Sequence, residues 1–137
     1  MVTKIAFTAY LDQNLNNLGP DQTIIYKGVL LNEGNAYNQY SGMFTVPVTG
    51  TYLFTATAEN NVGRLIWLKI VKNGALLVSI KVQPYSSYNT QATNTVIIRC
   101  SQGELVWVAV DTSHYGESLE GSSTIRTNTF SGVLLHQ

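Results

Sequence analysis

Charged side chains are scarce in this sequence of 137 residues, since they make up 12% of it against about 25% in an ordinary soluble domain. The eight basic and eight acidic residues cancel, so the chain lacks the long-range field that attracts nucleic acid or an anionic membrane surface. No apolar run reaches the roughly 18 residues that cross a bilayer. We therefore expect no nucleic acid partner and no membrane insertion.

Cysteine and histidine are also nearly missing. Cys100 is the single cysteine, so no internal disulfide can form, and its place in the apolar run TVIIRC favours a small buried side chain. A reactive or intermolecular thiol is the alternative. The histidines are His114 and His136 alone, which gives a zinc site within one chain little support.

Apolar residues are plentiful, and they recur with a period of two, which predicts strands and not helices. The Asn73-Gly74 pair lies between two alternating runs, and such a pair tolerates the positive φ of a tight turn. We predict a β-hairpin over 65–82 and eight to ten strands in all. With one domain over 1–137, the loops fall at 12–22, 32–42, 83–93 and 111–124.

Two of the predicted strands, LIWLKIV at 65–71 and LVWVAV at 105–110, are apolar on both faces. Antiparallel sheets usually keep one face in water. Something other than water should then cover the second face, and a subunit interface is the simplest cover, because obligate interfaces resemble a domain core cut in half. The pattern predicts a homo-oligomer.

A spaced aromatic motif runs through the stretch NEGNAYNQYSGMFTVPVTGTYLF. Four residues separate Asn32 from Tyr37, six separate Tyr37 from Phe44, and five separate Phe44 from the Gly50-x-Tyr52-x-Phe54 run. This spacing resembles the signature of the C1q domain, and the resemblance extends to AFTAYL at 6–11, YKGVLLNEGNAY at 26–37, VKNG at 71–74, GELVWV at 103–108 and TFSGVLL at 129–135. The signature residues are Asn32, Tyr37, Phe44, Gly50, Tyr52, Phe54, Phe130 and Gly132.

The resemblance implies an all-β fold: a ten-stranded jelly-roll β-sandwich, like that of tumour necrosis factor, that assembles as a homotrimer. It also implies secretion, and because 1–11 lacks the apolar segment of a signal peptide, we expect any leader to lie outside this sequence. Three positions depart from the family pattern: Tyr26 stands where Phe is usual, Ala56 where an aromatic is common, and Glu104 where Gly-Asp is usual.

No collagen-like repeat or heptad precedes the domain in this sequence. Short forms of this kind look most like the C1q-domain proteins of bivalve molluscs. There the family serves as secreted pattern-recognition proteins of innate immunity, often lectin-like.

Enzymatic readings find little support. GESLEG at 116–121 misses the G-x-S-x-G spacing of a nucleophile elbow by one residue, and no helix is predicted to follow it. Asp111, His114 and Ser118 supply the side chains of a triad but share one short loop, without a sign of an oxyanion hole. We predict a protein that is not an enzyme and requires no cofactor.

Calcium stays open as a cofactor. Asp111, Glu117 and Glu120 offer hard oxygen ligands, but the EF-hand pattern fails over this segment. Some family members bind calcium near the trimer apex, yet the sequence assigns no metal ligand here.

Two loops have the composition of a sugar site, which needs flat aromatic faces for the ring and planar polar groups for its hydroxyls. Arg126, just beyond the second loop, is the nearest cation for an anionic sugar or a lipopolysaccharide phosphate. The alternative is that the loop tyrosines pack on sheet edges or on a neighbouring subunit. The predicted ligand-binding residues are Tyr85, Ser87, Tyr88, Asn89, His114, Tyr115, Glu117 and Arg126.

Two functions compete on these grounds. The first is a secreted, lectin-like homotrimer that binds microbial carbohydrate or lipopolysaccharide, with three weak sites acting together. The second is a structural or matrix trimerisation module that binds no sugar and uses its loops for protein contacts.

Overall fold

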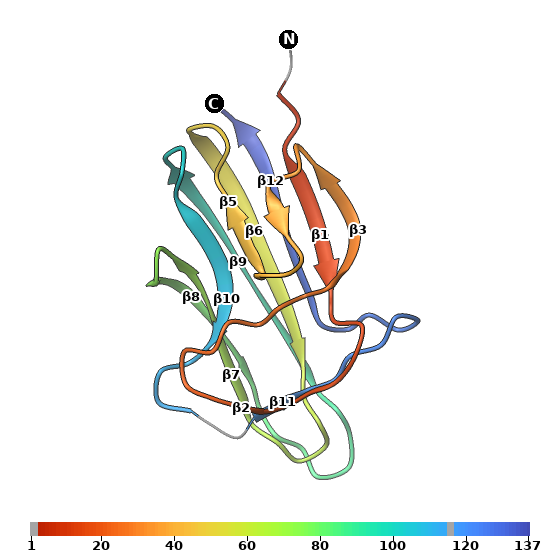
Figure 1. The fold of residues 1–137 in the computed structure, drawn as a ribbon. Coiled ribbons are helices and arrows are strands. Elements are labelled where there is room, and N and C mark those ends of the chain that lie inside the picture. Colours follow the sequence, from red (N-terminus) through yellow and green to blue (C-terminus); the bar gives the residue numbers. More distant parts are fainter. Residues whose placement is uncertain (1–2, 115–116) are drawn as a thin grey trace.

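The computed structural model describes residues 3–114 and 117–137. Within these residues the chain forms strands and no helix, and Figure 1 shows the strands stacked as a sandwich of two sheets. These described ranges include no helix long and apolar enough to span a membrane. The all-β prediction and the jelly-roll sandwich are confirmed.

The first sheet has five antiparallel strands and brings the two ends of the chain together. In spatial order these strands are β3 (Gly28–Glu33), β1 (Ala6–Tyr10), β12 (Thr129–His136), β6 (Gly50–Glu59) and β9 (Gln91–Cys100).

The second sheet also has five antiparallel strands, and it packs against the first. In spatial order these strands are β4 (Tyr37–Asn38), β5 (Met43–Thr45), β10 (Leu105–Val110), β7 (Ile66–Lys72) and β8 (Ala75–Val82). The ten strands of the two sheets match the predicted number.

A third, two-stranded element was not predicted. β2 (Leu15–Leu18) pairs with β11 (Glu117–Leu119), so the segments 12–22 and 111–124, both predicted as loops, each contain a short strand. Figure 1 shows this pair at the end of the sandwich away from the chain termini. The prediction that these segments are plain loops was wrong, because the apolar Leu18 and Leu119 are buried in the core.

The predicted hairpin is confirmed as β7 and β8, with Asn73 at φ 50° and Gly74 at φ 86° in the turn. Both residues adopt the left-handed conformation that this kind of turn requires. Two other short connections carry the chain from one sheet to the other: 46–49 joins β5 to β6, and 101–104 joins β9 to β10.

The signature aromatics meet between the sheets. The Phe7 ring stacks on Tyr37 with centroids 4.9 Å apart and meets Phe130 edge-on at 4.9 Å. Gly132 leaves the room for this cluster, because a Cβ atom there would lie 2.6 Å from Phe7 Cε1 and 2.8 Å from Phe54 Cδ1. These residues therefore form part of the core.

The outer face of the second sheet is covered in part by the chain itself. Val71 and Ala109 point outward from β7 and β10, yet they are 1% and 2% exposed. The segment before β3 extends the sheet beside β10, since Thr23 forms a bridge with Ala109 and the Asp21 N–H donates to the Val110 carbonyl at 3.1 Å. The doubly apolar pattern of these strands thus does not by itself require a second subunit.

The outer face of the first sheet is different, because it keeps a large apolar side chain in solvent: Ile97 on β9 is 59% exposed. Cross-strand registers line up uncharged side chains in rows across β9, β6 and β12. The rows are Ile97, Leu53 and Val133; Thr95, Thr55 and Ser131; and Thr93, Thr57 and Thr129. We call this surface the threonine face.

Candidate functional site

An exposed pair of tyrosines lies on the loop between β8 and β9. The rings of Tyr85 and Tyr88 are 5.4 Å apart and nearly parallel, with an interplanar angle of 5°. Their side chains stay in solvent, since Tyr85 is 51% exposed and Tyr88 66%. The structure therefore brings two of the predicted residues together as one aromatic surface.

The base of this loop is held by hydrogen bonds. The Gly63 N–H donates to the Tyr85 carbonyl at 2.9 Å, and the Thr90 hydroxyl donates to the Gln83 carbonyl at 2.7 Å. Asn60 is fully buried and accepts the Thr90 N–H at 2.9 Å on its Oδ1 atom. These bonds place the tyrosine pair on a fixed support.

Asn89 and Ser87, predicted in the same site, differ in their surroundings. The Asn89 Nδ2 atom donates to the Asn60 carbonyl at 2.7 Å, so this amide is directed at the main chain. Ser87 is exposed beside the two tyrosines in sequence. Within the loop, the aromatic rings and Ser87 face solvent, while Asn89 holds the backbone.

The second predicted loop is only partly described. Tyr115 lies outside the described residues, and Glu117 is placed only as the first residue of β11. His114 packs on Trp67 with ring centroids 4.8 Å apart. Because Trp67 alternates with core residues of β7, this contact lies on the outer face of the second sheet.

Arg126 lies on the opposite side of the sandwich. Its guanidinium stands 4.5 Å from the centroid of the Tyr10 ring, and its Nε atom donates to the Ser123 carbonyl at 2.7 Å. Tyr10 points outward from β1, since its neighbour Ala9 is buried. The structure thus separates Arg126 from His114, and a single anionic site built from both is not formed within one chain.

The carboxylate of the candidate triad is engaged by a neighbouring serine. The Asp111 carboxylate accepts the Ser113 hydroxyl at 2.6 Å and the Ser113 N–H at 3.0 Å. The hydroxyl bond is the main reason that the pKa of Asp111 lies below its usual value. His114 Nε2 is 4.0 Å from the Asp111 Oδ2 atom, while Ser118 lies in β11.

Metal ligands do not gather in the part of the chain that is described. No group of three or more His, Cys, Asp or Glu side chains there is placed to hold an ion. His136 is exposed in β12, and Cys100 is buried. Burial is the main cause that raises the pKa of the Cys100 thiol, which is the expected behaviour of a packed side chain.

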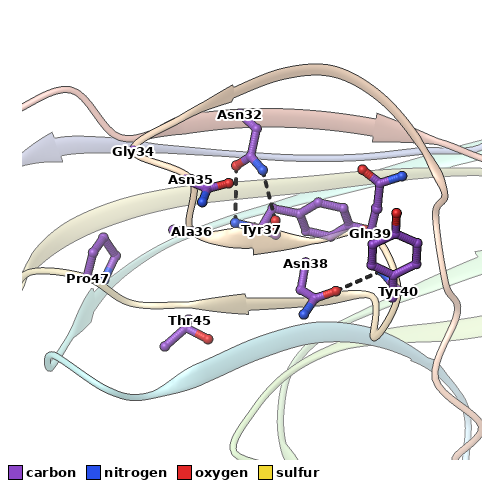
Figure 2. Close-up of a pocket in the computed structure, with 10 residues that line it drawn as sticks. All are labelled: Asn32, Gly34, Asn35, Ala36, Tyr37, Asn38, Gln39, Tyr40, Thr45 and Pro47. Atoms are coloured by element: carbon purple, nitrogen blue, oxygen red, sulfur yellow. Dashed lines mark hydrogen bonds between the residues drawn. The ribbon is translucent and has the colours of Figure 1, made fainter.

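A hollow of about 510 Å³ opens beside the signature stretch, at the edge where β3 and β4 lie. Figure 2 shows its lining, which comes from the β3 to β4 connection, the turn after β4, and β5. The lining residues are Asn32, Gly34, Asn35, Ala36, Tyr37, Asn38, Gln39, Tyr40, Thr45 and Pro47.

Two signature residues form the frame of this hollow. The Asn32 side chain donates to the Tyr37 carbonyl at 2.8 Å and accepts the Tyr37 N–H at 3.2 Å (Figure 2). The buried Tyr37 hydroxyl donates to the Tyr26 carbonyl at 2.6 Å. Sequence reasoning identified both residues as part of the signature but did not find the hollow that they support, since its polar residues look like those of any surface loop.

Comparison with known proteins relates the whole chain to one family. The family model described as C1q domain matches residues 6–135. The chain is 33% identical over 135 residues to mouse complement C1q and tumor necrosis factor-related protein 9 and 29% identical to zebrafish Caprin-2, in each case over 98% of the chain. It spans 40% of the first relative and 14% of the second.

Solved structures share the fold at low sequence identity. The globular domain of zebrafish complement 1qA matches with a TM-score of 0.79 at 16% identity, over 97% of this chain and 98% of that one. Murine APRIL matches with a TM-score of 0.76 at 13% identity, over 96% and 99%. These likenesses establish the architecture.

Proposed function

Because the chain belongs to the C1q domain family, we propose that it is a secreted, lectin-like recognition protein that binds microbial carbohydrate as a homotrimer. The observation that carries this proposal is the exposed, stacked pair of Tyr85 and Tyr88. In this reading the protein acts in innate immunity and performs no catalysis. Lipopolysaccharide is a further ligand through its sugar portion.

The tyrosine pair suits the apolar face of a pyranose. Aromatic rings bury large apolar areas, and their hydroxyl groups remain free for hydrogen bonds at the rim. With 51% of Tyr85 and 66% of Tyr88 in solvent, these rings do not serve the core of this chain. The hydrogen bond that Gly63 donates and the one that Asn60 accepts hold the base of the loop, which lowers the conformational cost of binding a ligand.

The threonine face supports assembly. Its centre carries no charge, and Ile97 is 59% exposed there in line with Leu53 and Val133. An uncharged sheet face with exposed apolar side chains is stabilised when a second copy covers it. We place the trimer contacts on this face, where three copies would present three loops and gain avidity.

A glycan array tests the binding. We expect signals from microbial glycans, retained by the Tyr85→Phe/Tyr88→Phe variant and reduced by Tyr85→Ala/Tyr88→Ala. Each ring contributes about 1 kcal/mol, so removal of both lowers single-site affinity by about 30-fold. The array is run with and without a chelator to test for calcium. A trimer with no glycan signal would instead indicate the structural module.

Light scattering tests the assembly. We expect a mass near three chains, and Ile97→Lys should shift it to one chain, because a lysine in each copy would place unpaired charges in the interface. Leu76→Lys is the matched control, since Leu76 is 60% exposed on the edge strand β8. If Ile97→Lys leaves the mass at three chains, the trimer uses another surface.

A further inference from the structure

The hollow beside the signature stretch is uncharged throughout. None of its ten lining residues is Asp, Glu, Lys, Arg or His. Amide side chains are instead concentrated there, from Asn32, Asn35, Asn38 and Gln39. Such groups donate and accept hydrogen bonds at once, which suits a neutral ligand with many hydroxyl groups.

The Asn38 amide is fixed in one orientation. Its Oδ1 atom accepts the Tyr40 N–H at 2.8 Å and the Ser41 N–H at 3.2 Å. Two donors on one side require the oxygen to lie there, so the NH₂ group must point the other way. This NH₂ group makes no hydrogen bond to another described residue, and it is therefore a free donor in the hollow.

An aromatic ring stands at the rim. Tyr40 is 78% exposed, and Figure 2 shows it beside Gln39 at one end of the lining, with Pro47 at the other. The side chains of Asn35 and Thr45 likewise make no hydrogen bond within the described residues. The hollow thus offers a flat apolar face together with amide and hydroxyl groups that are available to a ligand.

The frame of the hollow is held together by hydrogen bonds within this chain. Asn32 ties down both polar groups of the Tyr37 main chain. The Thr45 N–H donates to the Ala36 carbonyl at 2.9 Å, and the Gly42 N–H to the Asn38 carbonyl at 2.8 Å. A preformed site of about 510 Å³ falls within the range of small-molecule sites.

We propose that this hollow is a second carbohydrate site, which binds an uncharged pyranose through Tyr40, the Asn38 NH₂ group and Asn35. The proposal shares its ligand class with the proposed function but rests on different residues. The loop with Tyr85 follows β8, whereas the hollow lies at β4, on the opposite edge of the second sheet. With no cation in its lining, the hollow selects neutral sugars over sialic acid.

Titrations of the labelled protein with four sugars, followed by TROSY NMR, test this site. The sugars are N-acetylglucosamine, mannose, galactose and sialic acid. We expect at least one neutral sugar to shift the side-chain amide signals of Asn35 and Asn38, and sialic acid to leave them in place. The variant Asn38→Asp keeps both acceptor bonds of the turn but loses the NH₂ donor, so it should lower the affinity about tenfold.

The Tyr40 variants separate the ring from its hydroxyl. Tyr40→Phe should keep the affinity within about threefold, and Tyr40→Ala should lower it about tenfold. Because the side chain is exposed, neither change should alter folding. Equal affinity of the wild type, Asn38→Asp and Tyr40→Ala would overturn the proposal.

The same spectra distinguish this site from the tyrosine pair. Shifts at Tyr85 and Tyr88 alone would overturn the second site and leave the proposed function standing. Shifts in the hollow alone would support it and remove the role of the tyrosine pair. Acetylated tetra-alanine amide serves as a peptide probe. If this peptide shifts the signals of the hollow and none of the sugars does, the second site is overturned in favour of one for an extended peptide. If no sugar changes any signal, both proposals are overturned.

Discussion

Removing the hydroxyl oxygen of Tyr26 should raise the free energy of unfolding, which is an unusual result for a change in a protein core. Tyr26 is fully buried, its ring lies 5.9 Å from that of Phe130, and its hydroxyl has no hydrogen-bond partner among the described residues. Burial is also the main cause that raises the pKa of this phenol. A buried polar group without a partner costs about 1–3 kcal/mol. We expect Tyr26→Phe to stabilise the protein by about 1 kcal/mol.

Tyr37→Phe is the matched control, because it removes the same atom from a neighbouring buried ring. The Tyr37 hydroxyl donates to the Tyr26 carbonyl at 2.6 Å, so the change leaves that carbonyl without a strong bond. We expect it to destabilise the protein by about 1 kcal/mol. The two deletions should therefore have opposite signs, separated by about 2 kcal/mol.

Urea denaturation at pH 7 measures both variants, with the protein concentration held fixed because assembly changes apparent stability. At this pH both phenols are neutral, since even an unfolded tyrosine ionises only near pH 10. For a domain of this size, 1 kcal/mol corresponds to a shift of about 3–5 °C in the melting temperature. If Tyr26→Phe loses as much stability as Tyr37→Phe, the Tyr26 hydroxyl is bonded in solution and the reasoning is refuted.

Four further outcomes are expected. Asn60→Ala should lower the free energy of unfolding by about 2–3 kcal/mol and speed hydrogen exchange at the Thr90 amide, since that N–H loses its acceptor; unchanged exchange at Thr90 would contradict the clamp. Gly132→Ala should cost about 1–3 kcal/mol in denaturation experiments, because the new methyl group meets the Phe7 and Phe54 rings. The hydrogen bond from Lys69 at 2.6 Å lowers the pKa of Asp21. The stabilising effect of this bond is therefore present above the unfolded pKa of about 3.9 and is lost as the pH falls through the folded value. Lys69→Met should raise the pKa of Asp21 in an NMR titration. Cys100 should resist a thiol reagent until the protein unfolds, because it is buried and its pKa is raised.

Local patterns in the sequence predicted the scaffold well. The alternation of apolar residues and the Asn73-Gly74 turn are local signals, and β7 and β8 follow them closely. The aromatic spacing from Tyr37 to Phe54 resembled the signature of the family, and rings such as Phe44 and Phe54 do meet between the two sheets. Tyr26, which departs from the usual Phe, is also the position where the core retains an unpartnered hydroxyl.

Contacts between distant segments could not be predicted in this way. Thr23 pairs with Ala109, which is far from it in the chain, and Val71 and Ala109 are buried within one chain. Neither contact is visible in a local pattern, so the doubly apolar strands suggested a subunit interface instead. Likewise Arg126 lies close in sequence to the loop at 111–124, but its guanidinium packs on Tyr10 of the first sheet. Arg126 was assigned to that loop because the two are neighbours in sequence, whereas the folded chain holds them on different sheets.

The pairing of the first and last long strands has a practical consequence for topology. The Thr3 hydroxyl donates to the Gln137 side chain at 3.2 Å, and Figure 1 shows both ends of the chain on one side of the sandwich, opposite the loop that follows β8. A short peptide joining 137 to 3 would close the backbone into a circle without crossing a sheet. New termini could then be opened in the turn at Gly74, where a Cβ atom would meet no neighbour, to give a circular permutant whose tether leaves from a different point.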